Sequence, residues 1–150
     1  MMIAVIADDF TGAAELAGIS LRYGLKVEVC LGDVMDTGAD VLIVCTDSRS
    51  LNIEEAKAIT ATTVEFILKL KPEFIYKKID SVLRGHVIDE VKVQMKLSGM
   101  GKVLILPANP SLGRVIKNGE YFINSKKITE TGFVSDPEFP IRSSFVKDMV

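Results

Sequence analysis

The sequence has few side chains suited to metal binding or redox chemistry. Its 150 residues include two cysteines and one histidine, and the cysteines do not form a C-x-x-C pair. Cys30 and Cys45 lie in apolar, strand-like runs, where a cysteine usually packs as a small hydrophobic residue. A structural zinc site needs four such ligands. We therefore expect no metal site.

Motifs for nucleotides and nucleic acids are also missing. The chain contains neither a G-x-x-x-x-G-K-[ST] loop nor a G-x-G-x-x-G loop, so no stretch predicts an ATP or dinucleotide site. The formal net charge is −2, and lysine and arginine are not gathered into a basic block. This pattern argues against a nucleic-acid partner and favours a small molecule.

Signals for a membrane or for secretion are absent as well. Asp, Lys or Arg interrupts each apolar run before it reaches membrane-spanning length, and the start of the chain lacks the basic segment and cleavage site of a signal peptide. We expect a cytoplasmic protein with no membrane partner. The hydrophobic fraction of 48% and the charged fraction of 25% are typical of a globular domain, and the length favours one domain.

The sequence does contain alternating strand and helix patterns. Apolar runs typical of strands buried in a parallel sheet occur in four places, at residues 2–7, 41–45, 73–77 and 103–106. An alternating run over residues 25–31 predicts a strand near a sheet edge, followed by a loop over residues 32–40. Helical spacing of apolar residues predicts helices over residues 13–21, 53–70 and 87–95.

These patterns predict an α/β fold with three layers, in which helices cover both faces of a mainly parallel sheet. From Gly119 onward the pattern changes. Residues 121–128 predict a hairpin around Asn124-Ser125, although this pair is not the favoured Asn-Gly turn. Residues 129–140, which contain two prolines, predict an irregular C-terminal arm.

Polar residues follow each predicted buried strand, and the carboxyl ends of parallel strands meet at one edge of a sheet. Carboxylates and hydroxyls suit a polyhydroxy ligand, whereas arginine and lysine suit a carboxylate or phosphate group on it. The candidates for a site that binds a small acidic sugar are Asp8, Asp9, Thr11, Asp47, Ser48, Arg49, Lys77, Lys78, Asp80, Ser81, Arg84, Gly85, Asn109 and Arg114.

Several of these residues also have a purely structural interpretation. One acidic residue after the first strand, or Thr11, can serve only to cap the next helix. Asp80 and Arg84 can pair with each other and leave the ligand without a partner. Asn109 can belong to a simple turn. His86, which is isolated in the sequence, is better explained as a capping or supporting residue than as a catalyst.

Four motifs occur in a specific order: IADDFTGA at residues 6–13, TDSR at 46–49, YKKIDSVLRG at 76–85 and PANPSLGR at 107–114. Asn118-Gly119 and Asp136-Pro137 follow them. Together they resemble the N-terminal, sugar-binding domain of the four-carbon acid sugar kinases, which include threonate, erythronate and 2-oxo-tetronate kinases. The resemblance covers nearly the whole chain.

The resemblance implies phosphorylation by ATP of the terminal, 4-position hydroxyl of a four-carbon sugar acid. The N-terminal domain would hold the acid, and a C-terminal domain would hold ATP across a cleft. ATP and Mg²⁺ would serve the full family enzyme, and we expect neither to bind this chain alone. By position, the residues facing the substrate would be Asp8, Asp9, Asp80 and Arg84, with Arg49 and Arg114 as further anion contacts. Asp8 or Asp80 would accept the hydroxyl proton.

Three residues depart from the family pattern. Val82 stands where a threonine is usual, His86 where asparagine is frequent, and Asn109 where an aromatic residue is expected. Family members are also much longer than residues 1–150, so we expect an incomplete N-terminal domain, inactive without a nucleotide domain on a separate chain. An exposed sheet edge would favour a homo-oligomer.

Two other functions fit the sequence. Paired acids after the first strand, with Asp47 after a later one, suit a receiver-like phosphoacceptor domain that binds Mg²⁺. That fold would need a lysine after the last strand, where Pro107-Ala108-Asn109 stands instead. A non-catalytic module that only binds a sugar acid is the third possibility.

Overall fold

The computed structural model describes residues 2–32 and 38–150, so most of the predicted loop over residues 32–40 lies outside the described residues. Strands and helices alternate through the first two thirds of the chain, as the sequence predicts. The elements are β1 (Ile3–Ala7), α1 (Phe10–Arg22), β2 (Val27–Cys30), β3 (Val41–Cys45), α2 (Ile53–Lys69), β4 (Phe74–Lys78) and α3 (Val87–Ser98).

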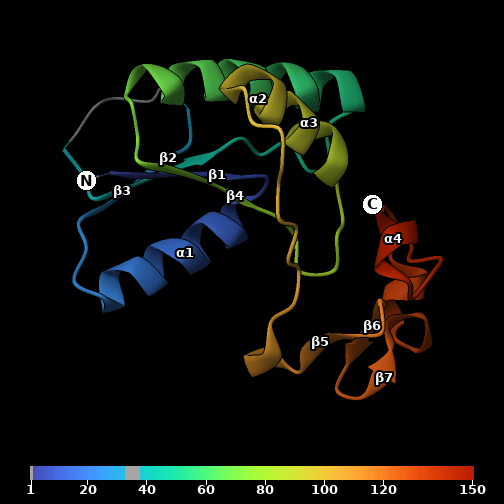
Figure 1. The fold of residues 1–150 in the computed structure, drawn as a ribbon. Coiled ribbons are helices and arrows are strands. Elements are labelled where there is room, and N and C mark those ends of the chain that lie inside the picture. Colours follow the sequence, from blue (N-terminus) through green and yellow to red (C-terminus); the bar gives the residue numbers. More distant parts are fainter. Residues whose placement is uncertain (1, 33–37) are drawn as a thin grey trace.

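The four strands form one parallel sheet in the order β2-β3-β1-β4. α1 covers one face, and α2 and α3 cover the other (Figure 1). Successive side chains of a strand point to opposite faces, so in β1 Ile6 packs toward α2 while Val5 packs toward α1. The predicted three-layer α/β fold is confirmed. Cys30 and Cys45 are both buried in these cores.

Side-chain caps set where two of the helices begin. α1 begins at Phe10, three residues earlier than predicted, because the Asp9 carboxylate accepts a hydrogen bond from the backbone N–H of Gly12 at 2.9 Å. Asn52 caps α2 in the same way. α3 ends at Gly99, whose φ of 68° is left-handed and favours glycine.

The fourth predicted buried strand, Val103–Leu106, is wrong. These residues form no strand and are mostly exposed, with Leu104 at 84% and Leu106 at 65%. A buried parallel strand needs a layer on each face. Beside this segment, β4 itself exposes Phe74 and Tyr76 on the side of α1, so pairing there would leave the same face uncovered.

The last third of the chain forms a separate three-stranded antiparallel sheet followed by short helical turns. Its elements are β5 (Arg114–Lys117), β6 (Glu120–Ile123), β7 (Lys126–Lys127), the 3₁₀ turns η2 (Ile128–Glu130) and η3 (Gly132–Ser135), and α4 (Val146–Met149). The predicted hairpin at Asn124-Ser125 and the irregular arm are confirmed. A second hairpin at Asn118-Gly119 was not predicted, although Asn-Gly is the favoured pair.

This small sheet has its own apolar core, which joins it to the loop after β4. Tyr121 and Ile128 are fully buried against Val82, which belongs to that loop. The apolar valine therefore suits this position, where the family pattern usually has threonine. The Tyr121 hydroxyl donates to the backbone carbonyls of Ser81 and Pro107, and burial raises its pKa to about 12. No helix in the described part of the chain is long and apolar enough to cross a membrane.

Candidate functional site

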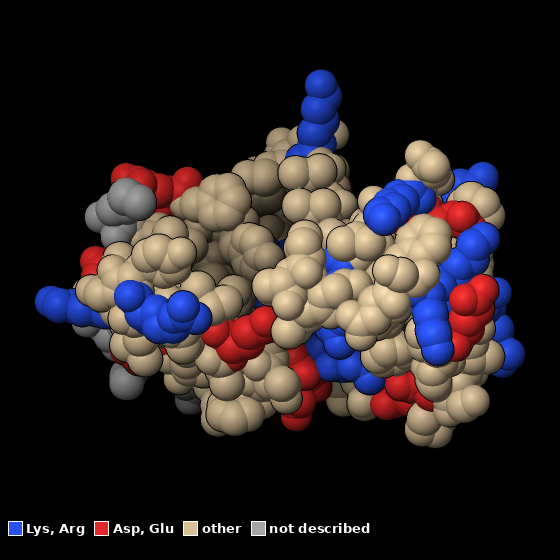
Figure 2. All heavy atoms as spheres, turned by 90° about the horizontal axis from the view of Figure 1, so that it is seen from below, with Lys and Arg blue, Asp and Glu red and all other residues tan. Residues whose placement is uncertain are grey.

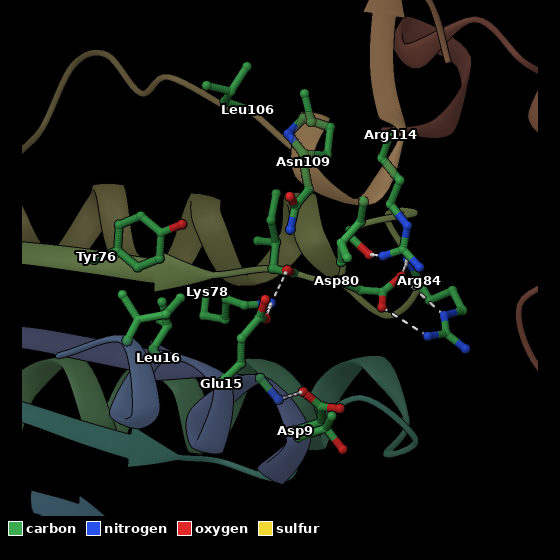
Figure 3. A pocket seen from close by; sticks show the side chains of 18 of the residues that line it. Asp9, Glu15, Leu16, Tyr76, Lys78, Asp80, Arg84, Leu106, Asn109 and Arg114 are labelled. Carbon is green, nitrogen blue, oxygen red and sulfur yellow. Dashed lines mark hydrogen bonds and ion pairs between the residues drawn. The ribbon is translucent and has the colours of Figure 1, made fainter. Parts of the chain in front are cut away.

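A cavity of about 720 Å³ opens at the carboxyl ends of the parallel strands. Its walls come from the start of α1, the end of β4 and its following loop, the segment after α3 and the start of β5 (Figure 3). The predicted site residues that line this cavity are Asp9, Thr11, Arg49, Lys78, Asp80, Ser81, Arg84, Asn109 and Arg114.

The other predicted site residues do not line the cavity. Asp8 and Ser48 are buried at 3% and 0% exposure. Gly85 lies behind Arg49, since a Cβ added to it would be 3.2 Å from Arg49 Cγ. Asp47 is exposed and has a left-handed φ of 48°. Lys77, whose ammonium pairs with the buried Glu90, also lies outside the cavity. None of these five residues forms the cavity wall.

Arg49 joins the two carboxylates that follow β1. Its Nε and Nη2 donate to Asp8 at 2.9 and 3.0 Å, and its Nη1 donates to Asp9 at 2.8 Å. Burial lowers the pKa of the Arg49 guanidinium, but the hydrogen bonds and charge of Asp8 outweigh this and raise it above the usual value. Both oxygens of Asp8 are therefore occupied by a permanent cation.

Arg84 makes a similar two-point contact with Asp80 in the loop after β4. Its Nε and Nη2 donate to the Asp80 oxygens at 3.1 and 2.9 Å, and the backbone N–H of Val82 donates at 3.0 Å. Burial alone would raise the pKa of Asp80, but the hydrogen bonds from Arg84 hold it below the usual value. Asp80 and Arg84 thus pair as the structural interpretation expects, and both still line the cavity.

Asp136 is a second partner of Arg84 that the sequence-based candidates did not include. Its carboxylate lies 3.3 Å from Arg84 Nη1 and also accepts the backbone N–H groups of Glu138 and Phe139. The Phe139 N–H is the main reason why the pKa of Asp136 is low. An Asp-Pro pair marks such turns, so this residue could have been found from the sequence.

Arg114 differs from the other two arginines of the cavity. Its Nη1 donates to the Ser81 hydroxyl, and within residues 2–32 and 38–150 no carboxylate lies at ion-pair distance from it. Two backbone hydrogen bonds between Asn109 and Arg114, at 2.9 and 3.0 Å, fix its main chain at the cavity wall. Arg114 is therefore available to an anionic group of a ligand.

Lys78 also has a partner that the sequence-based candidates did not include. Its Nζ lies 3.4 Å from a carboxylate oxygen of Glu15 and donates to the carbonyl of Ile79. Glu15 is one helical turn after Thr11 and so shares its face of α1. Helical spacing could therefore have identified it.

The cavity has an apolar end away from the arginines. Leu16 and Ile19 of α1, Tyr76 of β4 and Leu106 line it. Tyr76 is two residues before Lys78, so the alternation along a strand places both on the same face. His86 lies outside the cavity, where its Nε2 contacts the carbonyl of Leu51 at 2.7 Å, which agrees with a supporting role.

The site can hold a small anion that also carries hydroxyl groups. In the part of the chain that the structure describes, no three His, Cys, Asp or Glu residues are placed to bind a metal ion. The nearest carboxylates, Asp8 and Asp9, are joined by Arg49 instead. The fold and the cavity together define an α/β domain with a polar, arginine-lined cavity at the carboxyl ends of its strands, which is where small-molecule sites of such folds lie.

Comparison with known proteins identifies the family. Residues 3–150 match the family described as "Sugar-binding N-terminal domain", and the chain belongs to it. The chain is 34% identical over 153 residues to a D-threonate kinase of Salmonella typhimurium, covering 100% of this chain and 36% of the relative. It is 31% identical to a D-erythronate kinase of Heliobacterium modesticaldum, covering 99% and 35%. The resemblance seen in the motifs is confirmed.

A solved structure supports the fold over the same range. A Bordetella bronchiseptica protein, crystallised with bound citrate as a domain-swapped dimer, superposes with a TM-score of 0.87 at 29% identity. The match covers 99% of this chain and 39% of that one. The chain thus spans little more than a third of these relatives. Membership of this family leaves the receiver-like alternative without support, and Asp47, its proposed phosphoacceptor, lies outside the cavity.

Proposed function

We propose that this chain is the substrate-binding part of an ATP-dependent kinase, and that it holds a four-carbon sugar acid for phosphorylation at its terminal, 4-position hydroxyl. The observation that carries the proposal is the guanidinium of Arg114. It faces a polar cavity and has no carboxylate partner within the described ranges. A ligand carboxylate supplies the missing partner, and a guanidinium–carboxylate pair is a strong, directional contact.

The rest of the polar wall suits the hydroxyl groups of such an acid. With the acid group at Arg114 and Ser81, the carbon chain runs past Asn109 toward Lys78 and Asp9. Amide, ammonium and carboxylate groups offer donors and acceptors to hydroxyls. Between Asp8 and Asp80, our choice for the carboxylate that accepts the hydroxyl proton is Asp80, because it lines the cavity and Asp8 does not.

The phosphate donor has to be bound elsewhere. The sequence has no glycine-rich phosphate loop, and the described residues offer no metal-binding cluster. We therefore propose that a nucleotide-binding domain completes the kinase and that residues 1–150 alone do not turn over ATP. A non-catalytic sugar-acid binding module would show the same ligand binding but no activity with any such partner.

We further propose that the chain forms a homo-oligomer. The Bordetella relative was crystallised as a domain-swapped dimer. In this chain β4 is an edge strand with exposed apolar side chains, and such an edge favours association.

Calorimetric titration of the purified chain tests the binding function. We expect D-threonate, L-threonate or D-erythronate to bind and Mg-ATP to give no heat of binding. Arg114→Gln should weaken binding of the acid at least tenfold, because a hydrogen bond to a charged group contributes about 1.5–3 kcal/mol. Lys117→Gln, an exposed cation on the same strand and outside the cavity, is the matched control. Absence of binding by all three acids, or equal affinity in both variants, would contradict the proposal.

A further inference from the structure

A buried ion pair lies beneath the cavity and plays no part in the proposed substrate contacts. Glu90 of α3 is 1% exposed, and its Oε2 lies 2.6 Å from Lys77 Nζ of β4. The ammonium of Lys77 has no hydrogen-bond partner besides this carboxylate in the described residues. Removing two charges from water is costly, and a buried ion pair is seldom retained for stability alone.

The second oxygen of Glu90 reaches the loop after β3. Its Oε1 accepts a hydrogen bond from the Ser48 hydroxyl at 2.5 Å. Ser48 is fully buried, and its oxygen lies 2.8 Å from the hydroxyl of Thr46, which in turn contacts the carbonyl of Ala7 at 3.0 Å. Since a carboxylate can only accept, the Ser48 proton points to Glu90. The Thr46 hydroxyl has one proton, which goes either to the Ser48 oxygen or to the carbonyl of Ala7.

This chain of contacts fixes the residue next to Arg49. Ser48 directly precedes Arg49, whose backbone N–H donates to the carbonyl of Asp8 at 3.2 Å. Asp47 lies between Thr46 and Ser48, whose hydroxyls are both hydrogen-bonded. Its φ of 48° is a left-handed backbone conformation, which residues other than glycine adopt at a cost in free energy. Something must hold this turn in place, and Glu90 supplies the contact on its buried side.

We infer that Glu90, with Lys77 as its counter-ion, is a positioning residue: through Ser48 it holds the loop of residues 46–49 in the conformation from which Arg49 contacts Asp8 and Asp9. Neither residue touches the cavity. Lys77 orients the Glu90 carboxylate, Glu90 fixes Ser48, and Ser48 fixes the backbone from which Arg49 reaches Asp8 and Asp9. The consequence for ligand binding rests on the proposed function, whereas the effect on the loop does not.

The test uses two double variants that differ by one hydrogen-bond acceptor. Lys77→Met with Glu90→Leu removes both charges together, so no unpaired ion is left buried, and it removes the acceptor for Ser48. Lys77→Met with Glu90→Gln also removes both charges but keeps an amide oxygen in reach of Ser48. Hydrogen exchange of the Arg49 amide in the unliganded chain is the readout, with the Ile43 amide in β3 as internal reference.

We expect the Leu variant to exchange at Arg49 at least tenfold faster than wild type, while Ile43 is unchanged and the Gln variant stays within about threefold. A merely structural role would change both variants and the reference amide together. Exchange at Arg49 within twofold of wild type in the Leu variant would overturn the inference.

Titration with the sugar acid separates this inference from the proposed function. Loss of at least tenfold in affinity in the Leu variant, with recovery in the Gln variant, supports both. Faster exchange with unchanged affinity would overturn the link from Arg49 to the ligand. If wild type binds no acid, the proposed function fails, and the exchange rates alone decide whether Glu90 positions the loop.

Discussion

The arginines of the cavity wall differ in what surrounds them. Arg49 lies at ion-pair distance from three aspartates and Arg84 from two, whereas the guanidinium of Arg114 contacts only the hydroxyl of Ser81 among the described residues. A guanidinium between two carboxylates is neutralised and fixed in place, so it shapes the wall. One without a carboxylate keeps its charge for a ligand. The same residue type therefore has two roles, and only the partners distinguish them.

The Asp80–Arg84 pair predicts a defined dependence of stability on pH. Because the folded pKa of Asp80 is below the usual 3.8, its contribution is fully present above about pH 5 and is lost as pH falls through the folded pKa. Asp80→Asn should lower the free energy of unfolding by about 2 kcal/mol at pH 7, because Arg84 then faces an uncharged amide in place of the Asp80 carboxylate. Thermal unfolding measured between pH 2 and 7 checks this.

The difference in Tm between wild type and Asp80→Asn is the quantity to follow. It should be constant from pH 7 to about pH 5 and shrink below pH 4, because a protonated aspartic acid and asparagine are then both uncharged. A Tm difference that instead grows on acidification would show that folding raises the pKa of Asp80 and does not lower it.

Replacing Gly85 should disturb Arg49, and replacing a second glycine, Gly24, provides the control. Gly85 has a φ of 85°, and a Cβ there would lie 3.2 Å from Arg49 Cγ and 3.3 Å from Asp8 Oδ2. Gly24 has a similar φ of 75° but open space around it. Both Gly→Ala variants should lose about 1–2 kcal/mol through left-handed strain, and only Gly85→Ala should also weaken binding of the sugar acid.

Unfolding and titration of the two variants separate these effects. Equal affinity of Gly85→Ala and Gly24→Ala would mean that the close approach to Arg49 does not matter for the ligand.

At the level of single residues, the sequence predicts those site residues that directly follow the end of a strand. Asp9 and Asp80 are found in this way because strand ends are readable from apolar runs. Glu90 is not found, since an acidic residue in the first turn of α3 matches a helix dipole equally well. Only the approach of Lys77 and Ser48 in three dimensions reveals its role.

Among the elements, α1 couples fold and site because its cap residue also contacts Arg49. Asp9→Asn should keep the cap, since asparagine is as good a capping residue as aspartate, but should weaken the contact with Arg49. Asp9→Ala should lose the cap as well and unfold with about 1 kcal/mol less stability than Asp9→Asn. Denaturant unfolding of both variants measures the cap, and titration with the sugar acid measures the site.

If the two variants unfold alike, the hydrogen bond from Gly12 to Asp9 does not stabilise α1. If only Asp9→Ala affects the ligand, the charge of Asp9 is not used in binding, and the structural interpretation of this residue as a cap is sufficient.

Two strand assignments from the sequence fail because a strand depends on its neighbours as well as on its own composition. Val103–Leu106 has the composition of a strand, but a strand also needs a neighbour that lets it bury both faces, and composition does not report the neighbour. β5 has the opposite problem: Val115 and Ile116 form only a short apolar run, and the strand exists because the Asn118-Gly119 turn folds it onto β6. Turn chemistry was the available signal there.

In the whole molecule the two faces of the large sheet are covered unequally. α2 and α3 cover one face, whereas α1 alone packs on the other (Figure 1). On that side β4 exposes Phe74 at 58% and Tyr76 at 42%. The exposed side chains form a surface that we call the β4 face, made of Phe74, Tyr76, Ile19 and Leu106. Figure 2 views the molecule from this side, where uncharged residues cover much of the middle.

The β4 face predicts that the isolated chain associates with itself. Apolar side chains next to an unpaired edge strand gain by burial against a second copy, at roughly 25 cal/mol per Å² of apolar surface removed from water. Sedimentation equilibrium should therefore give an average mass that rises with concentration toward that of a dimer.

Phe74→Lys should keep the chain monomeric, because a charged residue at the edge opposes burial. Tyr23→Lys, which replaces a more exposed aromatic beyond the end of α1, should leave the association unchanged. Equal association in both variants would show that copies meet through another surface, and a monomer at every concentration would show that the β4 face needs no cover.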